Sequence, residues 1–140
     1  MNNEKTVLVK VNARRNWAKV DPDGRTADWS ADMQDAEIYA ETTQKYTNLA
    51  LVVSLSETEN GHTRVAISDD SDFILSKPLD EAAQMIDNAL QENRSLLDWT
   101  EFCPDSKANC AQAQQKAAAK RAERANRPGR KIMRAFRLSA

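Results

Sequence analysis

The chain has 140 residues, of which 41% are hydrophobic and 29% are charged, and its formal net charge is -1. This composition is typical of one soluble globular domain, and a chain of this length buries enough apolar surface to fold without a disulfide or a metal ion. No segment approaches the roughly 18 consecutive apolar residues of a membrane span, and the N-terminal residues do not resemble an export signal. We therefore expect a cytoplasmic protein.

The near-zero net charge is an average over two unlike segments. Residues 1–106 contain 20 acidic and 10 basic residues, which gives a net charge of -10. Residues 107–140 contain 10 basic residues and one acidic residue, Glu123, which gives a net charge of +9. A basic tail of this kind typically binds an anionic partner, most often nucleic acid or a membrane surface. The alternative is that the tail folds back on its own acidic body.

The first part of the chain predicts a strand, a turn and an ambiguous segment. Residues 6–11 are rich in β-branched side chains with a period of two, which predicts a strand. The sequence Asp21-Pro22-Asp23-Gly24 predicts a turn, because proline fixes φ at the second position and glycine tolerates a positive φ. Over residues 29–46, helical spacing competes with a β-branched and aromatic stretch at 38–43, and we favour a helix.

A β-hairpin is predicted around Asn60-Gly61, which separates the apolar run 49–55 from the run 63–67. A two-residue loop would place Leu55 opposite Ala66, whereas a three-residue loop would place it opposite Ile67. The hydrophobic pattern does not decide between these registers. Residues 73–75 predict a further short strand.

Two helices are predicted in the second half of the chain. The first opens near Pro78, carries apolar side chains at three-to-four spacing over residues 79–99, and ends near Cys103, because Pro104 disfavours a helical residue before it. Asp105 or Ser106 caps the second helix, which runs to about Asn126 and stops at residues 127–129 (Arg-Pro-Gly).

We therefore expect an α+β fold in which a small antiparallel sheet of about 3–5 strands packs against a helix. The predicted domains are an acidic α+β globular domain over residues 1–104 and a basic helical C-terminal extension over residues 105–140.

The basic extension is the strongest candidate for a binding surface. Residues 111–125 have too few large apolar side chains to bury a core face. A helix places Lys116, Lys120, Arg124 and Arg127 on one side, as a cationic ridge about 16 Å long that suits several phosphates. The predicted nucleic-acid contacts are Lys116, Lys120, Arg121, Arg124, Arg127, Arg130, Lys131, Arg134 and Arg137.

The last residues are basic and amphipathic. Ile132, Met133 and Phe136 fall at helical spacing, and the basic residues lie largely elsewhere on the helix. Such a segment docks on a protein groove, on an anionic membrane or on its own domain, so we interpret these three residues as partner-binding.

The residues that could carry other chemistry do not form a recognisable site. Cys103 and Cys110 are expected to be reduced, and with His62 as the single histidine they match no zinc pattern. Asp69, Asp70 and Asp72 lack the spacing of a calcium loop and are interpreted as a solvated turn.

A nucleotide site is also not predicted. The three glycines are isolated from one another, so no phosphate-binding loop is present. Trp17, beside Arg14 and Arg15, is a secondary candidate for stacking on a nucleobase. We therefore expect no enzymatic activity, no cofactor and no metal site.

Our main hypothesis is a non-enzymatic, regulatory binding protein whose basic C-terminal helix contacts nucleic acid or another polyanionic surface. The rival hypothesis is a small protein-interaction module, an inhibitor or accessory subunit, whose acidic body binds a partner protein; imitation of nucleic acid is one way in which it could do so. A third hypothesis is a homo-oligomer in which the tail of one copy binds the body of the next.

Overall fold

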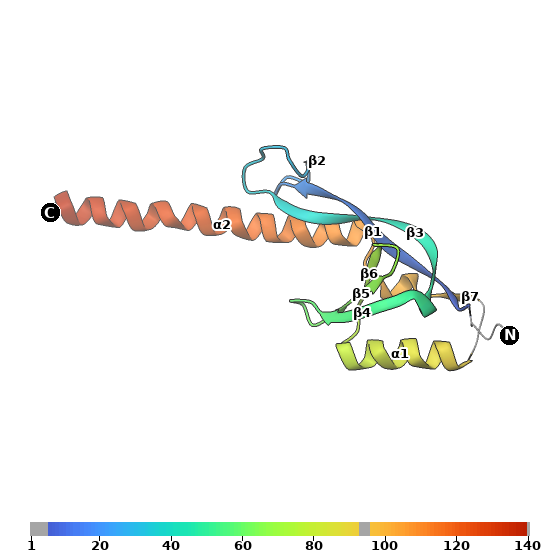
Figure 1. The fold of residues 1–140 in the computed structure, drawn as a ribbon. Helices are drawn as coiled ribbons and strands as arrows, with labels where there is room; N and C mark the ends of the chain where they lie inside the picture. Colours follow the sequence, from blue (N-terminus) through green and yellow to red (C-terminus); the bar gives the residue numbers. More distant parts are fainter. Residues whose placement is uncertain (1–5, 93–95, 140) are drawn as a thin grey trace. The chain divides into compact units, whose positions relative to one another are not determined.

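The computed structural model describes the backbone of residues 6–92 and 96–139, and the side chains of residues 6–92 and 96–126. Within these residues the fold is α+β, as expected, with seven strands, two α-helices and two short 3-10 helices (Figure 1). The strand count exceeds the number that the sequence predicts. The strands are β1 (Leu8–Val20), β2 (Thr26–Asp28), β3 (Glu37–Asn48), β4 (Val52–Glu57), β5 (Thr63–Ile67), β6 (Asp72–Leu75) and β7 (Leu96–Asp98).

The sheet is organised around β1. Its strand order is β2-β1-β6-β5-β4, and β3 and β7 also pair with β1. Strand β1 is antiparallel to β2 and β6 but parallel to β7, with Leu8 opposite Leu96. It is longer than the strand predicted over residues 6–11: Ala13 continues the buried face beyond Val11, and after the exposed residues 15–17 burial resumes at Ala18 and Val20.

By packing, the described residues divide into two compact units. Unit 1 contains residues 6–16, 41–92 and 96–107, and unit 2 contains residues 17–40 and 108–139. Strands β1 and β3 contribute residues to both units.

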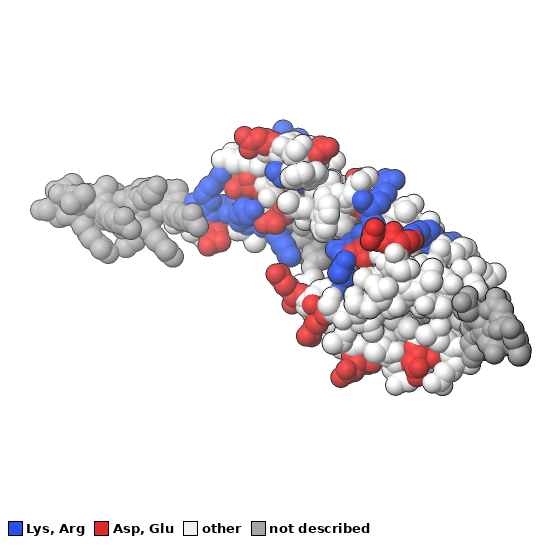
Figure 2. All heavy atoms as spheres, viewed as in Figure 1, with Lys and Arg blue, Asp and Glu red and all other residues white. Residues whose placement is uncertain are grey.

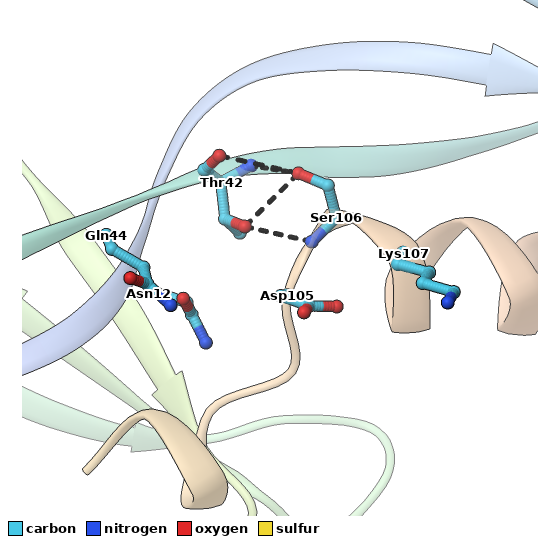
Figure 3. A pocket seen from close by; sticks show the side chains of 6 residues that line it. All are labelled: Asn12, Thr42, Gln44, Asp105, Ser106 and Lys107. Atoms are coloured by element: carbon cyan, nitrogen blue, oxygen red, sulfur yellow. Dashed lines mark hydrogen bonds between the residues drawn. The ribbon is translucent and has the colours of Figure 1, made fainter. Parts of the chain in front are cut away.

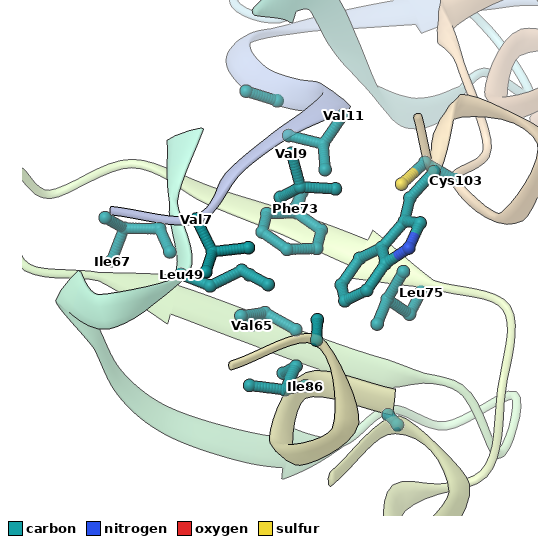
Figure 4. Packing of buried hydrophobic residues seen from close by; sticks show 14 residues of the cluster. Val7, Val9, Val11, Leu49, Val65, Ile67, Phe73, Leu75, Ile86 and Cys103 are labelled. Carbon is teal, nitrogen blue, oxygen red and sulfur yellow. The ribbon is translucent and has the colours of Figure 1, made fainter. Parts of the chain in front are cut away.

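Unit 1 contains the main hydrophobic core, where side chains from the sheet and from α1 (Leu79–Glu92) meet (Figure 4). On α1, Ala82, Ile86 and Ala89 are buried, and their spacing of four and three residues places them on one helical face. Phe73 on β6 is 1% exposed. Burying a side chain of this size contributes about 1.5–3 kcal/mol, so this core fixes the geometry of unit 1.

Residues 37–48 form strand β3, so the helix that we favoured over residues 29–46 is wrong. The β-branched and aromatic side chains at 38–43 prefer an extended backbone, and pairing with β1 satisfies their backbone groups. The helical spacing before residue 37 is therefore coincidental.

Helix α1 ends at Glu92, whereas the sequence predicts that it continues to about Cys103. Leu97 lies in β7 beside β1, and the backbone N–H of Trp99 donates to the carbonyl of Lys10 at 2.9 Å. A short 3-10 helix, η2 (Thr100–Phe102), follows. Leu97 and Trp99 continue the apolar stripe of the helix in sequence, but Leu97 packs on the core from strand β7 and Trp99 packs into it from the residue that precedes η2.

The predicted hairpin forms, but in neither of the predicted registers. Leu55 lies opposite Val65 and Glu57 opposite Thr63, so five residues separate the last pair. Gly61 has a φ of +76° and donates its N–H to the carbonyl of Thr58. The turn is therefore at the predicted place, and its longer loop shifts the pairing. A 3-10 helix, η1 (Leu49–Leu51), precedes β4 and shortens the predicted apolar strand.

Four local predictions are confirmed. The turn at residues 21–24 closes through a hydrogen bond from the N–H of Gly24 to the carbonyl of Asp21, and Gly24 has a φ of +88°. Strand β6, the start of α1 at Leu79 and the start of the second helix at Ser106 also lie where the sequence places them.

Helix α2 spans Ser106–Ser139 without the predicted stop at residues 127–129. Alanine, lysine, arginine, methionine and leucine, which are all strong helix formers, flank the Pro-Gly pair on both sides.

Candidate functional site

In unit 2, helix α2 buries a face of small side chains. Ala113 is 5% exposed and Ala117 is fully buried. The other buried apolar residues of this unit, Ala18, Val20 and Ala40, are also small, which lets backbones approach closely. The prediction that residues 111–125 cannot bury a face is therefore wrong, because alanines four residues apart suffice when the opposing side chains are small.

Side-chain hydrogen bonds fix the helix against the strands of unit 2. The Nδ2 of Asn109 donates to the carbonyl of Ala40 at 3.1 Å, and the Nε2 of Gln114 donates to the carbonyl of Pro22 at 3.2 Å. A Cβ atom added to Gly24 would lie 3.2 Å from the same Nε2, so the glycine also makes room for Gln114. The turn at residues 21–24 is thus a docking element for α2.

The basic side chains that follow the alanine face form ion pairs with acidic residues of the same unit. Lys120 Nζ lies 2.9 Å from Glu37 Oε1, and Arg121 Nη1 lies 3.1 Å from Asp23 Oδ1. Arg124 Nη2 lies 2.7 Å from Asp35 Oδ2. These three cations continue the buried face along the helix, because they follow Ala117 at helical spacings of three, four and seven residues.

Asp35 is the least exposed acid of this cluster. Its side chain is 5% exposed, and it also lies 3.7 Å from Nε of Arg121. Its Oδ2 accepts no hydrogen bond, so the two arginines hold it by charge alone. The residue has a φ of +59°, a conformation that aspartate tolerates better than most residues.

Asp21 organises the turn that precedes this cluster. Its side chain accepts hydrogen bonds from the backbone N–H groups of Asp23 and Arg25 and from Nε of Arg25. Desolvation acts to raise the pKa of Asp21, but the hydrogen bonds and charge of Arg25 outweigh it and hold the pKa below its usual value. Hydrogen bonding to Asp23 likewise raises the pKa of Arg121. Both groups therefore keep their charges at neutral pH.

The structure changes the interpretation of the cationic ridge. Lys120, Arg121 and Arg124, three of the predicted nucleic-acid contacts, already lie against acids from residues 23–37. Their side chains remain between 42% and 48% exposed. Lys116 is exposed and has no ion-pair partner among the described side chains.

The remaining predicted contacts lie outside the described side chains. They are Arg127, Arg130, Lys131, Arg134 and Arg137, together with the predicted partner-binding residues Ile132, Met133 and Phe136. The sequence could have indicated an acidic partner for these cations, because residues 21–37 contain six acidic residues and one basic residue. It could not show that Glu37, at the start of β3, and Asp35, just before it, lie beside α2.

Charge is distributed differently over the two units. Figure 2 shows only acidic side chains over α1, at the foot of the view, where Asp80, Glu81 and Asp87 are exposed. Over the described part of unit 2, acidic and basic side chains are intermixed (Figure 2). The surface of α1 is therefore the part of the predicted acidic domain where acidic side chains are least mixed with basic ones.

A shallow depression of about 220 Å³ in unit 1 is lined by polar side chains (Figure 3). Thr42 and Ser106 bind each other there: the N–H of Thr42 donates to Oγ of Ser106 at 2.6 Å, and the N–H of Ser106 donates to Oγ1 of Thr42 at 2.9 Å. Nδ2 of Asn12 donates to the carbonyls of Thr100 and Cys103. The hydrogen bonds of these groups hold the start of α2 and the chain before it in place. We therefore interpret the depression as a structural feature and not as a ligand site.

The aspartates of residues 69–72 hold their own loop and the neighbouring strands. Asp69 accepts from both the N–H and the Oγ of Ser71. Asp72 is bound by Nε of Arg14 at 2.8 Å and by Nε of Arg64 at 2.7 Å. Because Asp72 forms these ion pairs, its interpretation as part of a solvated turn is wrong.

The histidine, the cysteines and the exposed Trp17 do not gather into one site. Among the described residues, no three His, Cys, Asp or Glu side chains are arranged to hold a metal ion. Cys103 and Cys110 are both free, as expected for a reduced pair. His62 lies in the hairpin loop. Trp17 is 49% exposed on β1.

None of the helices searched within the described part of the chain has the length and apolar character needed to cross a membrane. No known family model, curated protein or solved structure matches the chain, so the function has to be argued from its own residues.

Proposed function

We propose that this chain is a non-enzymatic binding protein whose basic C-terminal helix contacts a polyanion, with nucleic acid as the ligand class. Unit 2 holds the first part of the helix in place, and the cationic residues from Arg127 onward contact the phosphates of the ligand.

The observation that supports this proposal is where the intrachain ion pairs lie along α2. Lys120, Arg121 and Arg124 pair with acids of unit 2. From residue 125 onward the sequence contains five basic residues and no acidic one. The backbone remains helical to Ser139. The segment with the largest unbalanced charge therefore follows directly on a helix that is anchored by Ala113 and Ala117.

The physical basis of such binding is the release of counterions from the phosphates. The ten helical steps from Arg127 to Arg137 correspond to about 15 Å, a distance over which duplex DNA presents several phosphates. Lysine and arginine contacts to phosphates position a protein on the duplex but do not read its sequence. We therefore expect tight binding at low salt, a steep salt dependence and little sequence preference.

The test is the binding of the full chain to a short duplex DNA and to an RNA strand over a salt series from about 50 to 200 mM. In the variant Arg130→Gln/Arg134→Gln, two proposed contacts are lost, and the slope of log K against log salt for DNA should become shallower by about 2. The matched control, Lys45→Gln/Lys107→Gln, removes the same charge from unit 1 and should leave the slope unchanged.

Equal slopes for the two variants, or no binding by the unmodified chain at low salt, would contradict the proposal. Binding of a basic partner protein that is lost in Asp80→Asn/Asp87→Asn on the α1 surface would favour the rival function of an acidic interaction module. Light scattering that shows a mass falling with salt would favour self-association.

A further inference from the structure

We propose that Asp23, Asp35 and Glu37 act as an internal competitor for the polyanion, so that the protein holds three of its helix cations in an autoinhibited state. This inference rests on the proposed function. The three acids are called the acidic clamp below.

The clamp holds consecutive cations on one helical face. It contacts Lys120, Arg121 and Arg124 at 2.9, 3.1 and 2.7 Å. These cations immediately precede the charge-rich segment that begins at Arg127. A polyanion bound to that segment would meet Arg124 and Lys120 next along the helix, and would have to replace carboxylates with phosphates to engage them.

The clamp is not required to dock the helix. Ala113 and Ala117 are buried one to three turns before the clamped cations, and Asn109 and Gln114 bind backbone carbonyls of the same unit. Helix docking can therefore survive the loss of the ion pairs, which is a condition for a reversible contact.

The clamped cations also remain accessible. The side chains of Lys120, Arg121 and Arg124 are 48%, 42% and 44% exposed. The carboxylates of Glu37 and Asp23 are also 31% and 56% exposed, and ion pairs with this much solvent contact contribute little to stability and weaken as salt is added. The carboxylate of Asp35 is 5% exposed, so its pair with Arg124 is the most shielded of the three. Because Oδ2 of Asp35 accepts no hydrogen bond, Arg124 is held there without the directional bonds of a two-point arginine–carboxylate contact. A row of phosphates can compete for such a cation.

The experiment compares two double variants of the full chain, each of which removes two negative charges from residues 17–40. In Asp35→Asn/Glu37→Gln the clamp is opened at Lys120 and Arg124, and asparagine is accepted at the positive φ of Asp35. In Asp28→Asn/Asp32→Asn both altered acids are exposed and lie outside the clamp, and Asp28 binds the N–H of Ser30, so the clamp stays intact. The measurements are the affinity for a short duplex DNA and its salt dependence.

We expect the clamp variant to bind about tenfold more tightly at low salt, with a slope of log K against log salt steeper by about 2, because two cations become available to phosphates. The control variant should keep the slope of the unmodified chain. Equal slopes for all three proteins would overturn the clamp and leave the proposed function standing. No binding by any of the three would overturn both.

A single variant provides a second test in case the double variant does not fold. Glu37→Gln opens only the pair with Lys120 and should bind more tightly than the unmodified chain. Adding Lys120→Gln to it should abolish that gain, because the freed cation is then absent. A gain that persists in the Lys120→Gln/Glu37→Gln chain would show that the effect does not pass through this ion pair, and would contradict the clamp.

Discussion

Arg124 and Asp35 are 89 positions apart in sequence, yet the Nη2 of the arginine lies 2.7 Å from Oδ2 of the aspartate. This contact joins the basic helix α2 to the acidic segment that leads into β3. It shows that part of the charge of the tail is neutralised within the chain, whereas the sequence beyond Arg124 supplies five further cations with no acid among them.

The alanine face of α2 should not tolerate larger side chains. Ala117→Leu forces extra atoms into a fully buried position and should lower the free energy of unfolding by about 1–3 kcal/mol. Urea denaturation followed by far-UV circular dichroism measures the effect. Ala118→Leu is the matched control, because Ala118 is exposed on the same helix and leucine is a good helix former there. Equal midpoints for the two variants would show that the face is not packed.

Asp72 should contribute stability that is lost in acid. Burial acts to raise its pKa, but hydrogen bonds from Arg14 and Arg64 outweigh it and hold the pKa below its usual value in the folded state. Its contribution is therefore complete above about pH 4 and disappears as the pH falls through the folded pKa. Asp72→Asn should lower the free energy of unfolding by about 1–3 kcal/mol at pH 7.

The check is urea denaturation of both proteins at pH 7 and at progressively lower pH. The difference between them should shrink below about pH 4, where Asp72 becomes protonated in the unmodified chain. Asp70→Asn is the control, since Asp70 is exposed and asparagine suits its φ of +69°. A difference between Asp72→Asn and the unmodified chain that is constant with pH would contradict the role of the Asp72 charge.

The two cysteines should differ in reactivity. Burial raises the pKa of the Cys103 thiol to about 11, and its side chain is in the core of unit 1. At pH 8 only about one Cys103 in a thousand is then a thiolate, the form that reacts. Iodoacetamide should therefore modify Cys110, which is partly exposed, well before Cys103. Peptide mass spectrometry over time measures both rates, and faster labelling of Cys103 in the folded chain would refute its burial.

The sequence predicts those parts of the fold that depend on local chemistry. The turn at residues 21–24 follows from proline and glycine, and the start of α1 follows from Pro78 and the apolar residues after it. The prediction from sequence fails where contacts between residues that are distant in sequence determine the local structure. Residues 37–48 are a strand because β1 offers them a partner, and Trp99 completes the core from outside the helix whose spacing it shares.

The candidate site is predicted only in part for the same reason. The charge of residues 107–140 and the helical spacing of Lys120 and Arg124 are properties of the sequence. That these side chains lie against Glu37 and Asp35 depends on β3, which the sequence analysis assigns to a helix. The alanine face is missed because alanine packs only where the opposing residues are small, and that is a tertiary property.

The most direct test of the polyanion interface is a titration of the isotope-labelled full chain with a short duplex DNA, followed through backbone amide NMR signals. We predict that the largest shifts occur over residues 127–139, with smaller shifts at Lys116, Lys120 and Arg124 and none in α1. Shifts centred on α1, or an unchanged spectrum at low salt, would contradict the account.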